Sequence, residues 1–369
     1  MKVLALAPYP IEAAATRYRV AQFVAPLAER GIDVSIRPFL DAKMFAGLYR
    51  KDSWLRTAVG LAKSGALRLL DVPAARKADV VLLQREAMIF GPPVVEWLIR
   101  SVLKRPLVLD LDDATYVRYI SPTYGGIGSR LKWFSKTDDL IKWAAIVVCG
   151  NRAIAEYVSS KGATARTIPT VVDTNIFRPS AERHERKPPV LGWIGTHSTF
   201  PYLEAIFPVF QRLAAKHSFR LKIIGAGKDS VTIPGVEVEN IPWSLEREVR
   251  DFQSIDIGLY PIDNRLYGEW ALGKSGFKAI QYMAVGIAYV ATPIGAAAEI
   301  GEAGKTHFFA SSDDEWHDAL ELLLTDDSQR TEMGAAGRRH AVEHYGLQSQ
   351  ADKLASALRE AANQSASQE

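Results

Sequence analysis

The chain has 369 residues, 48% of them apolar and 24% charged, which is the balance of a soluble globular protein long enough for two domains. Its 45 Lys and Arg residues nearly offset its 42 Asp and Glu residues, so a dedicated nucleic-acid-binding protein is not expected. The single cysteine, Cys149, excludes an internal disulfide framework and a thiolate zinc cluster. No apolar run approaches the roughly 18 residues of a membrane span, and the opening apolar stretch meets Pro8 too soon for a signal peptide. We therefore expect a cytoplasmic protein.

Short apolar runs alternate with helix-like segments through the first half of the chain. The strand candidates are residues 3–7, 32–36, 80–83, 106–111 and 145–149. Such alternation predicts a parallel sheet that is covered by helices on both faces.

The same alternation restarts after residue 187, with strand candidates at 190–194, 221–224, 236–238, 256–260 and 288–291. A polar, proline-bearing linker over 168–189 separates the halves, and a helix is expected over 348–362 with a frayed tail beyond it. We predict an α/β protein of two facing, Rossmann-like, doubly wound domains, 1–170 and 171–347, with the C-terminal helix at about 348–369 packing back on the first. Ligands of such sheets bind in the cleft at the carboxyl ends of the strands.

The segment GKSGFK, Gly273 to Lys278, is the strongest candidate site in the second half. It follows a predicted strand and opens a helix, and Ser275 is a natural N-cap for that helix. The amide groups and dipole of a helix start favour an anion, and Lys274 and Lys278 add two positive charges beside them. Gln281, one turn further along, could hydrogen-bond a hydroxyl of the same ligand. The pattern favours phosphate binding, although lysines in solvent and glycines in a turn would produce the same sequence pattern.

The C-terminal half resembles the retaining, GT-B-fold glycosyltransferases of family 4. QYMAVGIAYVATPIGAAAEI, which ends at Ile300, matches their EAMA-x-G-x-PVVAT-x-x-GG-x-x-EI segment closely. GWIGTHSTFPYLEAI resembles their phosphate loop, IIGAGKD and VENIPW their base-contacting segments, and PTVVDTNIF their interdomain hinge.

This resemblance implies a transferase that uses a UDP- or GDP-linked sugar as co-substrate, with no other cofactor and no metal. The donor-binding residues that it implies are Gly195, Thr196, His197, Gly225, Trp243, Ser275, Gly276, Phe277, Lys278 and Gln281. Lys274 would neutralise the leaving diphosphate, and that phosphate could itself take the acceptor proton.

Two positions depart from the family pattern and keep other functions open. The family's paired glutamates fall on Gly273 and Gln281, so one carboxylate is missing and the other is an amide. The sequence instead resembles a branch whose motif reads GK-x-x-FK-x-x-QYMA. The missing carboxylate keeps open a catalytically silent sugar-nucleotide-binding or scaffold subunit. It argues against a third interpretation, a GT-B-fold epimerase, because the carboxylate pair that such chemistry would use is absent.

Charged residues in the first half follow predicted strands and form the candidate acceptor side. Arg17 and Arg19 follow the first strand, and Asp110, Asp112 and Asp113 end the fourth. We assign Arg17 and Asp112 to the catalytic centre with Lys274, and Arg19 and Asp113 to acceptor binding, because arginine suits phosphate or a carboxylated sugar. The alternatives are surface charge for the arginines and a helix cap for Asp113.

Residues 43–68 carry six basic side chains and one acidic side chain among aromatic and aliphatic ones. This composition suits the anionic inner face of the cell membrane, where a lipid-linked acceptor would lie, or else a plain solvated helix. Trp133, Phe134 and Trp143 would extend that surface or lie in the core. The seven histidines show no paired metal spacing.

Overall fold

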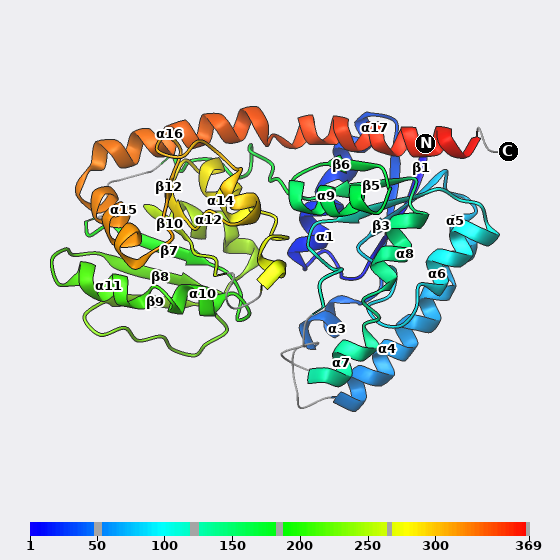
Figure 1. Cartoon of the computed structure of the whole chain (residues 1–369), viewed down its shortest axis with the longest axis horizontal. Helices are drawn as coiled ribbons and strands as arrows, with labels where there is room; N and C mark the ends of the chain where they lie inside the picture. The colour runs from blue at the N-terminus through cyan, green and yellow to red at the C-terminus, as the bar shows by residue number, and fades with distance from the viewer. Residues whose placement is uncertain (48–53, 119–124, 182–186, 264–267, 367–369) are drawn as a thin grey trace. The chain divides into compact units, whose positions relative to one another are not determined.

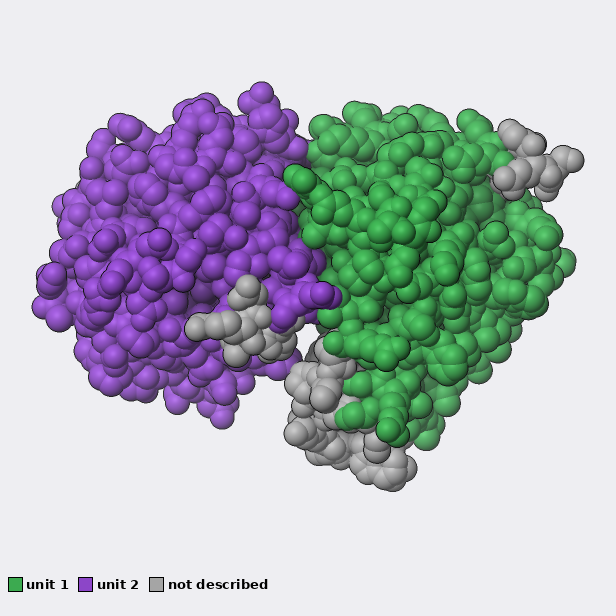
Figure 2. Space-filling view, viewed as in Figure 1, with its two compact units in different colours: residues 1–170, 348–369 green, residues 171–347 purple. Residues whose placement is uncertain are grey.

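The chain folds into two compact units in the computed structural model, which describes residues 1–47, 54–118, 125–181, 187–263 and 268–366. Unit 1 comprises residues 1–170 and 348–369, and unit 2 comprises residues 171–347 (Figure 2). Each unit contains one six-stranded sheet in which every paired strand is parallel. The prediction of an α/β fold with two doubly wound sheets is therefore confirmed.

The sheet of unit 1 has the strand order β2-β1-β3-β4-β5-β6 (Figure 1). Its strands are β1 (Lys2–Ala7), β2 (Asp33–Pro38), β3 (Val80–Gln84), β4 (Leu107–Leu111), β5 (Ile146–Cys149) and β6 (Ala165–Thr167). The central strands β3, β4 and β5 are buried along their whole length, because helices cover both faces of the sheet.

The helices of unit 1 include one from the C-terminal end of the chain. They are α1 (Ala14–Arg19), α2 (Val24–Glu29), α3 (Ala42–Gly47), α4 (Trp54–Leu69), α5 (Asp71–Ala75), α6 (Val94–Trp97), α7 (Gly125–Leu131), α8 (Lys136–Trp143), α9 (Arg152–Ser160) and α17 (Leu347–Ala366). Asp352 and Glu360 of α17 pair with Arg30 and Arg166 of unit 1 at 2.6 and 2.9 Å. The helix extends beyond the predicted end at residue 362, so the expected fraying there is wrong as far as Ala366.

The sheet of unit 2 has the order β12-β11-β10-β7-β8-β9. Its strands are β7 (Val190–Ile194), β8 (Arg220–Ile224), β9 (Glu237–Ile241), β10 (Ile257–Tyr260), β11 (Ala288–Ala291) and β12 (Phe308–Phe309). Its helices are α10 (Phe200–Glu204), α11 (Phe207–Ala214), α12 (Glu248–Gln253), α14 (Phe277–Ala284), α15 (Asp313–Thr325) and α16 (Asp327–His344). The edge strands β6 and β12, with three and two residues, are the strands that the sequence pattern did not predict.

Candidate functional site

Each sheet has a point at which its strand order reverses. In unit 1, β1 lies between β2 and β3, and in unit 2, β7 lies between β10 and β8. Ligands of open parallel sheets bind outside the carboxyl ends of the strands at such a point. The predicted site residues lie in the segments that follow the strands of both sheets, so they form two groups, one in each unit.

Three predicted donor-binding residues of unit 2 meet where β7, β8 and β9 end. A Cβ atom on Gly225 would lie 2.5 Å from the carbonyl oxygen of Gly195 and 3.2 Å from Cβ of Trp243. Gly225 also has a φ of 82°, in the left-handed region that favours glycine. Only glycine therefore allows these segments to approach so closely.

The loop after Gly195 exposes Thr196 and His197, but its first amides already have partners. The Gly195 N–H donates to the carbonyl oxygen of Ile224 at 3.0 Å, and the Thr196 N–H donates to Oγ1 of Thr199 at 3.1 Å. A ligand at this loop would therefore contact the side chains of Thr196 and His197 and not these two amides.

Helix α14 is fixed to the sheet by a buried tyrosine. The Tyr282 hydroxyl lies 3.0 Å from the carbonyl oxygen of Gly192 in β7 and 3.2 Å from that of Leu259 in β10, and it shares its proton between them. A Cβ atom on Gly258 of β10 would lie 2.6 Å from the tyrosine ring. Burial raises the pKa of Tyr282, so it remains a neutral donor at physiological pH.

The start of α14 differs from the prediction. The N-cap is Gly276, with φ 65° and ψ 10°, and no side chain caps the helix, so the assignment of Ser275 as the N-cap is wrong. A Cβ atom on Gly276 would lie 2.2 Å from Cδ1 of Ile300. The tight packing and the positive φ both require glycine there, which moves the first helical residue to Phe277.

The two lysines of this segment have different surroundings. Nζ of Lys278 donates to Oε1 of Gln281 at 2.9 Å and lies 5.2 Å from the centre of the Phe252 ring. Nζ of Lys274 lies 5.2 Å from the centre of the Trp270 ring, and this side chain is half-buried. Lys274 precedes the helix and Lys278 lies in its first turn, so both ammonium groups are candidates for contact with a ligand at the helix start.

Gln281 is fully buried, so the expected direct contact with a ligand hydroxyl is wrong. Its amide nitrogen lies 3.5 Å from Oε1 of Glu248 on α12, and its oxygen accepts the bond from Lys278. Gln281 thus connects two charged side chains and fixes the position of Lys278.

In unit 1, Arg17 braces the loop that precedes it. Its Nη1 lies 3.2 and 3.1 Å from the carbonyl oxygens of Ile11 and Glu12, and its guanidinium stacks on the Tyr18 ring at 4.8 Å. The side chain is half-buried at the end of β1 where a ligand would approach, and part of its hydrogen-bonding capacity is already used.

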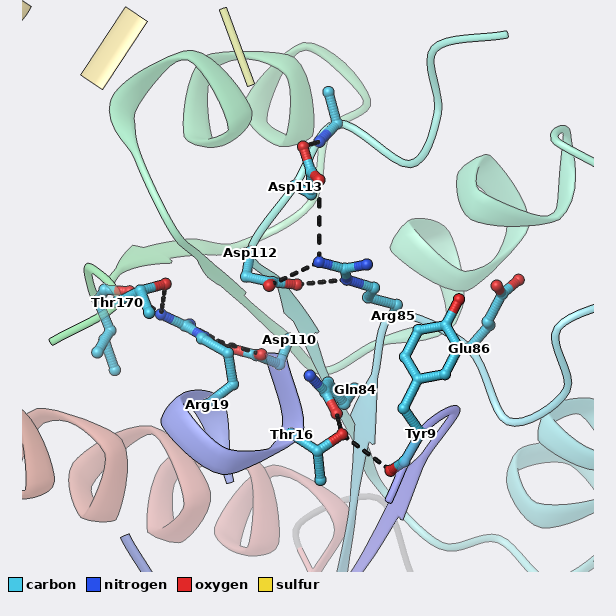
Figure 3. Close-up of polar contacts among 12 residues, drawn as sticks. Tyr9, Thr16, Arg19, Gln84, Arg85, Glu86, Asp110, Asp112, Asp113 and Thr170 are labelled. Atoms are coloured by element: carbon cyan, nitrogen blue, oxygen red, sulfur yellow. Dashed lines mark hydrogen bonds and ion pairs between the residues drawn. The ribbon is translucent and has the colours of Figure 1, made fainter. Parts of the chain in front are cut away.

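Arg19 is buried, with 3% exposure, so the prediction that it stands at the mouth of a cleft is wrong. Its guanidinium pairs with both carboxylate oxygens of Asp110 and donates to the carbonyl oxygen of Ile168 at 2.7 Å (Figure 3). Burial on its own would lower the pKa of Arg19, but the charge and hydrogen bonds of Asp110, together with the charge of Asp112, raise it. The pair joins α1 to β4, and the bond to Ile168 joins α1 to the chain just after β6.

Asp112 pairs with Arg85, a residue that the sequence reasoning did not single out. Nε and Nη2 of Arg85 lie 2.5 and 2.7 Å from the two carboxylate oxygens of Asp112, and Nη2 lies 3.9 Å from Asp113 (Figure 3). Burial alone would raise the pKa of Asp112, but the charge and hydrogen bonds of Arg85 lower it, so this carboxylate is ionised at neutral pH.

Arg85 also has an unusual backbone. Its φ is 58°, a left-handed value that costs energy in any residue with a Cβ atom, and its N–H donates to the carbonyl oxygen of Asp110 at 2.8 Å. This strained residue follows β3 directly at the switch point of unit 1. A signal for it existed in the sequence, because polar residues at the ends of adjacent parallel strands converge, and Arg85 ends the strand beside Asp110 and Asp112.

Asp113 caps a turn and not a helix. Its Oδ1 accepts the Ala114 N–H at 3.1 Å, and the next described helix, α7, begins only at Gly125. Its half-buried carboxylate is thus one of three acidic groups here that face arginine: Asp110 faces Arg19, and Asp112 and Asp113 face Arg85.

The basic segment 43–68 lies partly in α3 and α4, with residues 48–53 outside the described part of the chain. Val59 is 70% exposed and Leu67 52%, but Arg68 is buried and donates to the carbonyl oxygens of Ala7 and Arg37 at 2.9 Å each. Arg68 therefore does not contribute to the expected membrane surface. Among the described residues, no helix is long and apolar enough to cross a membrane.

The aromatic residues after α7 divide between surface and core. Trp133 is 48% exposed, whereas Trp143 packs against the apolar core of unit 1. Trp133 therefore extends the exposed apolar surface, whereas Trp143 does not.

Comparison with known proteins identifies the architecture. Residues 188–326 match the family model of group 1 glycosyl transferases. HepE of Anabaena in complex with UDP-glucose superposes with a TM-score of 0.66 at 16% identity, over 97% of this chain and 99% of that chain. The sucrose-phosphate synthase of Thermosynechococcus elongatus gives a TM-score of 0.69 at 12% identity, over 97% and 98% of the chains. The chain has the GT-B glycosyltransferase fold.

A further GT-B structure, a glycosyltransferase from Rickettsia africae, gives a TM-score of 0.69 at 12% identity over 98% of both chains. Comparison with curated proteins gives no match. The matched family model lies within unit 2. It supports the resemblance of GKSGFK and its surroundings to group 1 glycosyl transferases, and the solved structures support the GT-B fold.

Proposed function

We propose that this protein is a retaining glycosyltransferase that moves a sugar from a nucleoside diphosphate donor to a glycan or lipid-linked acceptor. The observation that carries the proposal is the group of residues at the carboxyl edge of unit 2. There, Gly195, Gly225 and Trp243 meet beside strands within the group 1 match, and Lys274 stands before α14. HepE of Anabaena, which shares the fold, binds UDP and UDP-glucose.

Unit 2 would hold the donor. A diphosphate near Gly276 would face the positive end of α14 and the Lys274 ammonium, and both stabilise negative charge. This charge grows as the bond between the sugar C1 atom and the phosphate oxygen breaks, so the same groups would lower the barrier. The acceptor oxygen then bonds to C1, and its proton passes to the leaving phosphate. No metal is needed for this scheme.

Unit 1 would hold the acceptor near Arg85 and Asp112. Arg85 keeps the Asp112 carboxylate ionised, and a carboxylate that is already bound by arginine still has lone pairs that can accept a hydroxyl hydrogen. Asp112 would therefore orient a sugar or acceptor hydroxyl, and Arg85 would position Asp112.

The experiment that tests the proposal has two parts. Calorimetry with UDP and with GDP identifies the base, and release of nucleotide from UDP- and GDP-sugars measures turnover. Release with one donor supports a transferase. Binding without release, with any acceptor tried, would support the silent subunit that Gly273 suggests, since this position lacks the carboxylate of the family pattern.

Charge reversal at Lys274 tests the donor site directly. We expect Lys274→Glu to weaken nucleoside diphosphate binding by about 30-fold or more, because a charge-assisted contact contributes about 2 kcal/mol. Lys353→Glu, an exposed change on α17 of unit 1, is the matched control and should bind normally. Equal affinity of the Lys274 variant and the wild type would contradict the site assignment.

A further inference from the structure

Two histidines that are far apart in the sequence converge on α15 of unit 2. His217 follows α11, and its Nε2 lies 2.8 Å from Oε1 of Glu321. His317 lies on α15, with Nδ1 3.2 Å from Oδ1 of Asp318 and 3.9 Å from Oε2 of Glu321. The nearest ligand atoms of His317, Asp318 and Glu321 all lie within 4.8 Å of one another. His217 thus joins this three-residue group through its contact with Glu321.

The packing beneath this cluster holds its backbone in place. Val209, Phe210 and Leu213 of α11 and Trp316, Leu320 and Leu323 of α15 belong to one buried apolar core. The His217 N–H donates to the carbonyl oxygen of Leu213 at 2.8 Å, which fixes its position after the helix. His317 is itself 6% exposed. The core and this hydrogen bond therefore hold the backbone that carries the four side chains.

The chemistry and spacing of the four groups fit a transition-metal ion. Zinc binds imidazole nitrogen and carboxylate oxygen at about 2.0–2.2 Å in tetrahedral sites, which places neighbouring ligand atoms roughly 3.3 Å apart. The separations of 3.2 and 3.9 Å around His317 are close to that value. Two carboxylates also supply the negative charge that a divalent cation requires.

The other charged residues near the cluster lie on α11, directly after it, and on α15. Lys216 is the cation beside the cluster that would oppose a metal. The remaining ionic contact on this side of α15, Asp314 with Arg212, is a separate pair at 2.8 Å.

We propose that His217, His317, Asp318 and Glu321 form a binding site for a divalent transition-metal ion of the zinc class. The ion would join the end of α11 to α15 and stabilise unit 2, independently of sugar transfer. The sequence spacing gave no sign of such a site, because its ligands come from two separate segments that only the fold brings together.

A second pair of histidines provides an internal control. His340 and His344 are four residues apart on α16, with ring centres 4.4 Å apart, and Nδ1 of His340 lies 3.8 Å from Glu302. Helical i, i+4 histidines can bind metal on their own, so any binding must be assigned to one pair or the other.

The test is a titration of the tag-free full-length chain, after chelator treatment, with ZnCl₂ alone by calorimetry. We expect one ion per chain and a rise in Tm of about 2–4 °C at saturating zinc. His217→Ala and Asp318→Asn should each weaken binding by about ten-fold or more. The double variant His340→Ala/His344→Ala should bind like the wild type, and CoCl₂ should give the visible absorption of tetrahedral cobalt.

Asp318 and His217 are chosen because their side chains are 80% and 24% exposed, so these variants are expected to fold, which far-UV circular dichroism checks. The absence of zinc binding to the wild type would overturn the proposal and leave a surface ion-pair cluster. Zinc binding that survives both variants but is lost in the His340/His344 variant would overturn it as well. Nucleotide binding is measured in parallel, so that a failure of the proposed function can be told apart from a failure of the metal site. The zinc result does not depend on sugar transfer.

Discussion

Two arginine–aspartate pairs lie at the switch point of unit 1, and they differ in their exposure to solvent. The side chains of Arg19 and Asp110 are 2% and 4% exposed, so this pair is closed to a ligand. The Arg85 side chain is 19% exposed and that of Asp112 9%, so this pair borders on solvent. Arg19 therefore has a structural role, while Arg85 and Asp112 remain available to an acceptor.

The Arg85 pair leads to a prediction on stability and pH. Arg85→Ala would leave the Asp112 carboxylate buried without its partner, which should lower the free energy of unfolding by about 2–4 kcal/mol at pH 7. Because the wild-type pKa of Asp112 is lowered, the stability from this pair is present above about pH 4 and is lost as pH falls below it. Urea unfolding at pH values between 3 and 7 measures the loss of stability in Arg85→Ala and the pH dependence of stability in the wild type.

A double variant separates loss of the pair from loss of packing. Arg85→Leu/Asp112→Leu removes both charges, so it should recover part of the stability lost in Arg85→Ala. If Arg85→Ala unfolds with the same free energy as the wild type at neutral pH, the pair does not stabilise unit 1. Nucleotide binding by unit 2 should be the same in all three proteins.

At the scale of elements, α14 depends on the absence of side chains from the sheet below it. A Cβ atom on Gly258 would lie 2.6 Å from the Tyr282 ring, and one on Gly192 would lie 2.2 Å from Ile255. The first contact sets how closely α14 approaches β10, and the second sets how closely the chain after α12 approaches β7. Gly258 therefore helps to position the helix at whose start we propose the donor site.

Gly258→Ala should lower the free energy of unfolding by about 1–3 kcal/mol, because the added methyl group overpacks the core against Tyr282. Gly65→Ala on α4 is the matched control, since no atom lies within 4 Å of its added Cβ. That change should be neutral or stabilising by about 0.5–1 kcal/mol. Chemical unfolding followed by fluorescence measures both, and an equal effect of the two substitutions would contradict the packing argument.

Strand prediction from the sequence succeeded where apolar residues form short runs, as in Val190–Ile194, because buried parallel strands have a strong local signal. The edge strands β6 and β12 lack this signal, since they are short and half exposed. The candidate site was harder to predict. Gly276 owes its role to tertiary packing and to backbone conformation, which leave no local pattern, and Arg85 could be found only by comparing the ends of adjacent predicted strands.

At the scale of the whole molecule, exposed apolar residues concentrate on α4 of unit 1 and the turn after it. Val59, Leu67, Leu69 and Leu70 are 70, 52, 47 and 68% exposed, and Lys63 is the exposed basic residue that the structure describes on this helix. Apolar side chains beside basic ones match the composition of an anionic lipid interface.

We therefore expect the chain to sediment with vesicles of anionic phospholipid and to be released by salt, which screens the basic residues. Val59→Asp/Leu70→Asp should reduce the bound fraction by about five-fold or more, because it removes apolar burial and adds repulsion from the lipid charge. Val342→Asp, at a 47% exposed apolar position in unit 2, is the matched control and should sediment like the wild type. If the wild type stays in the supernatant, or if both variants lose binding equally, α4 is a solvated helix and the acceptor must reach unit 1 from solution.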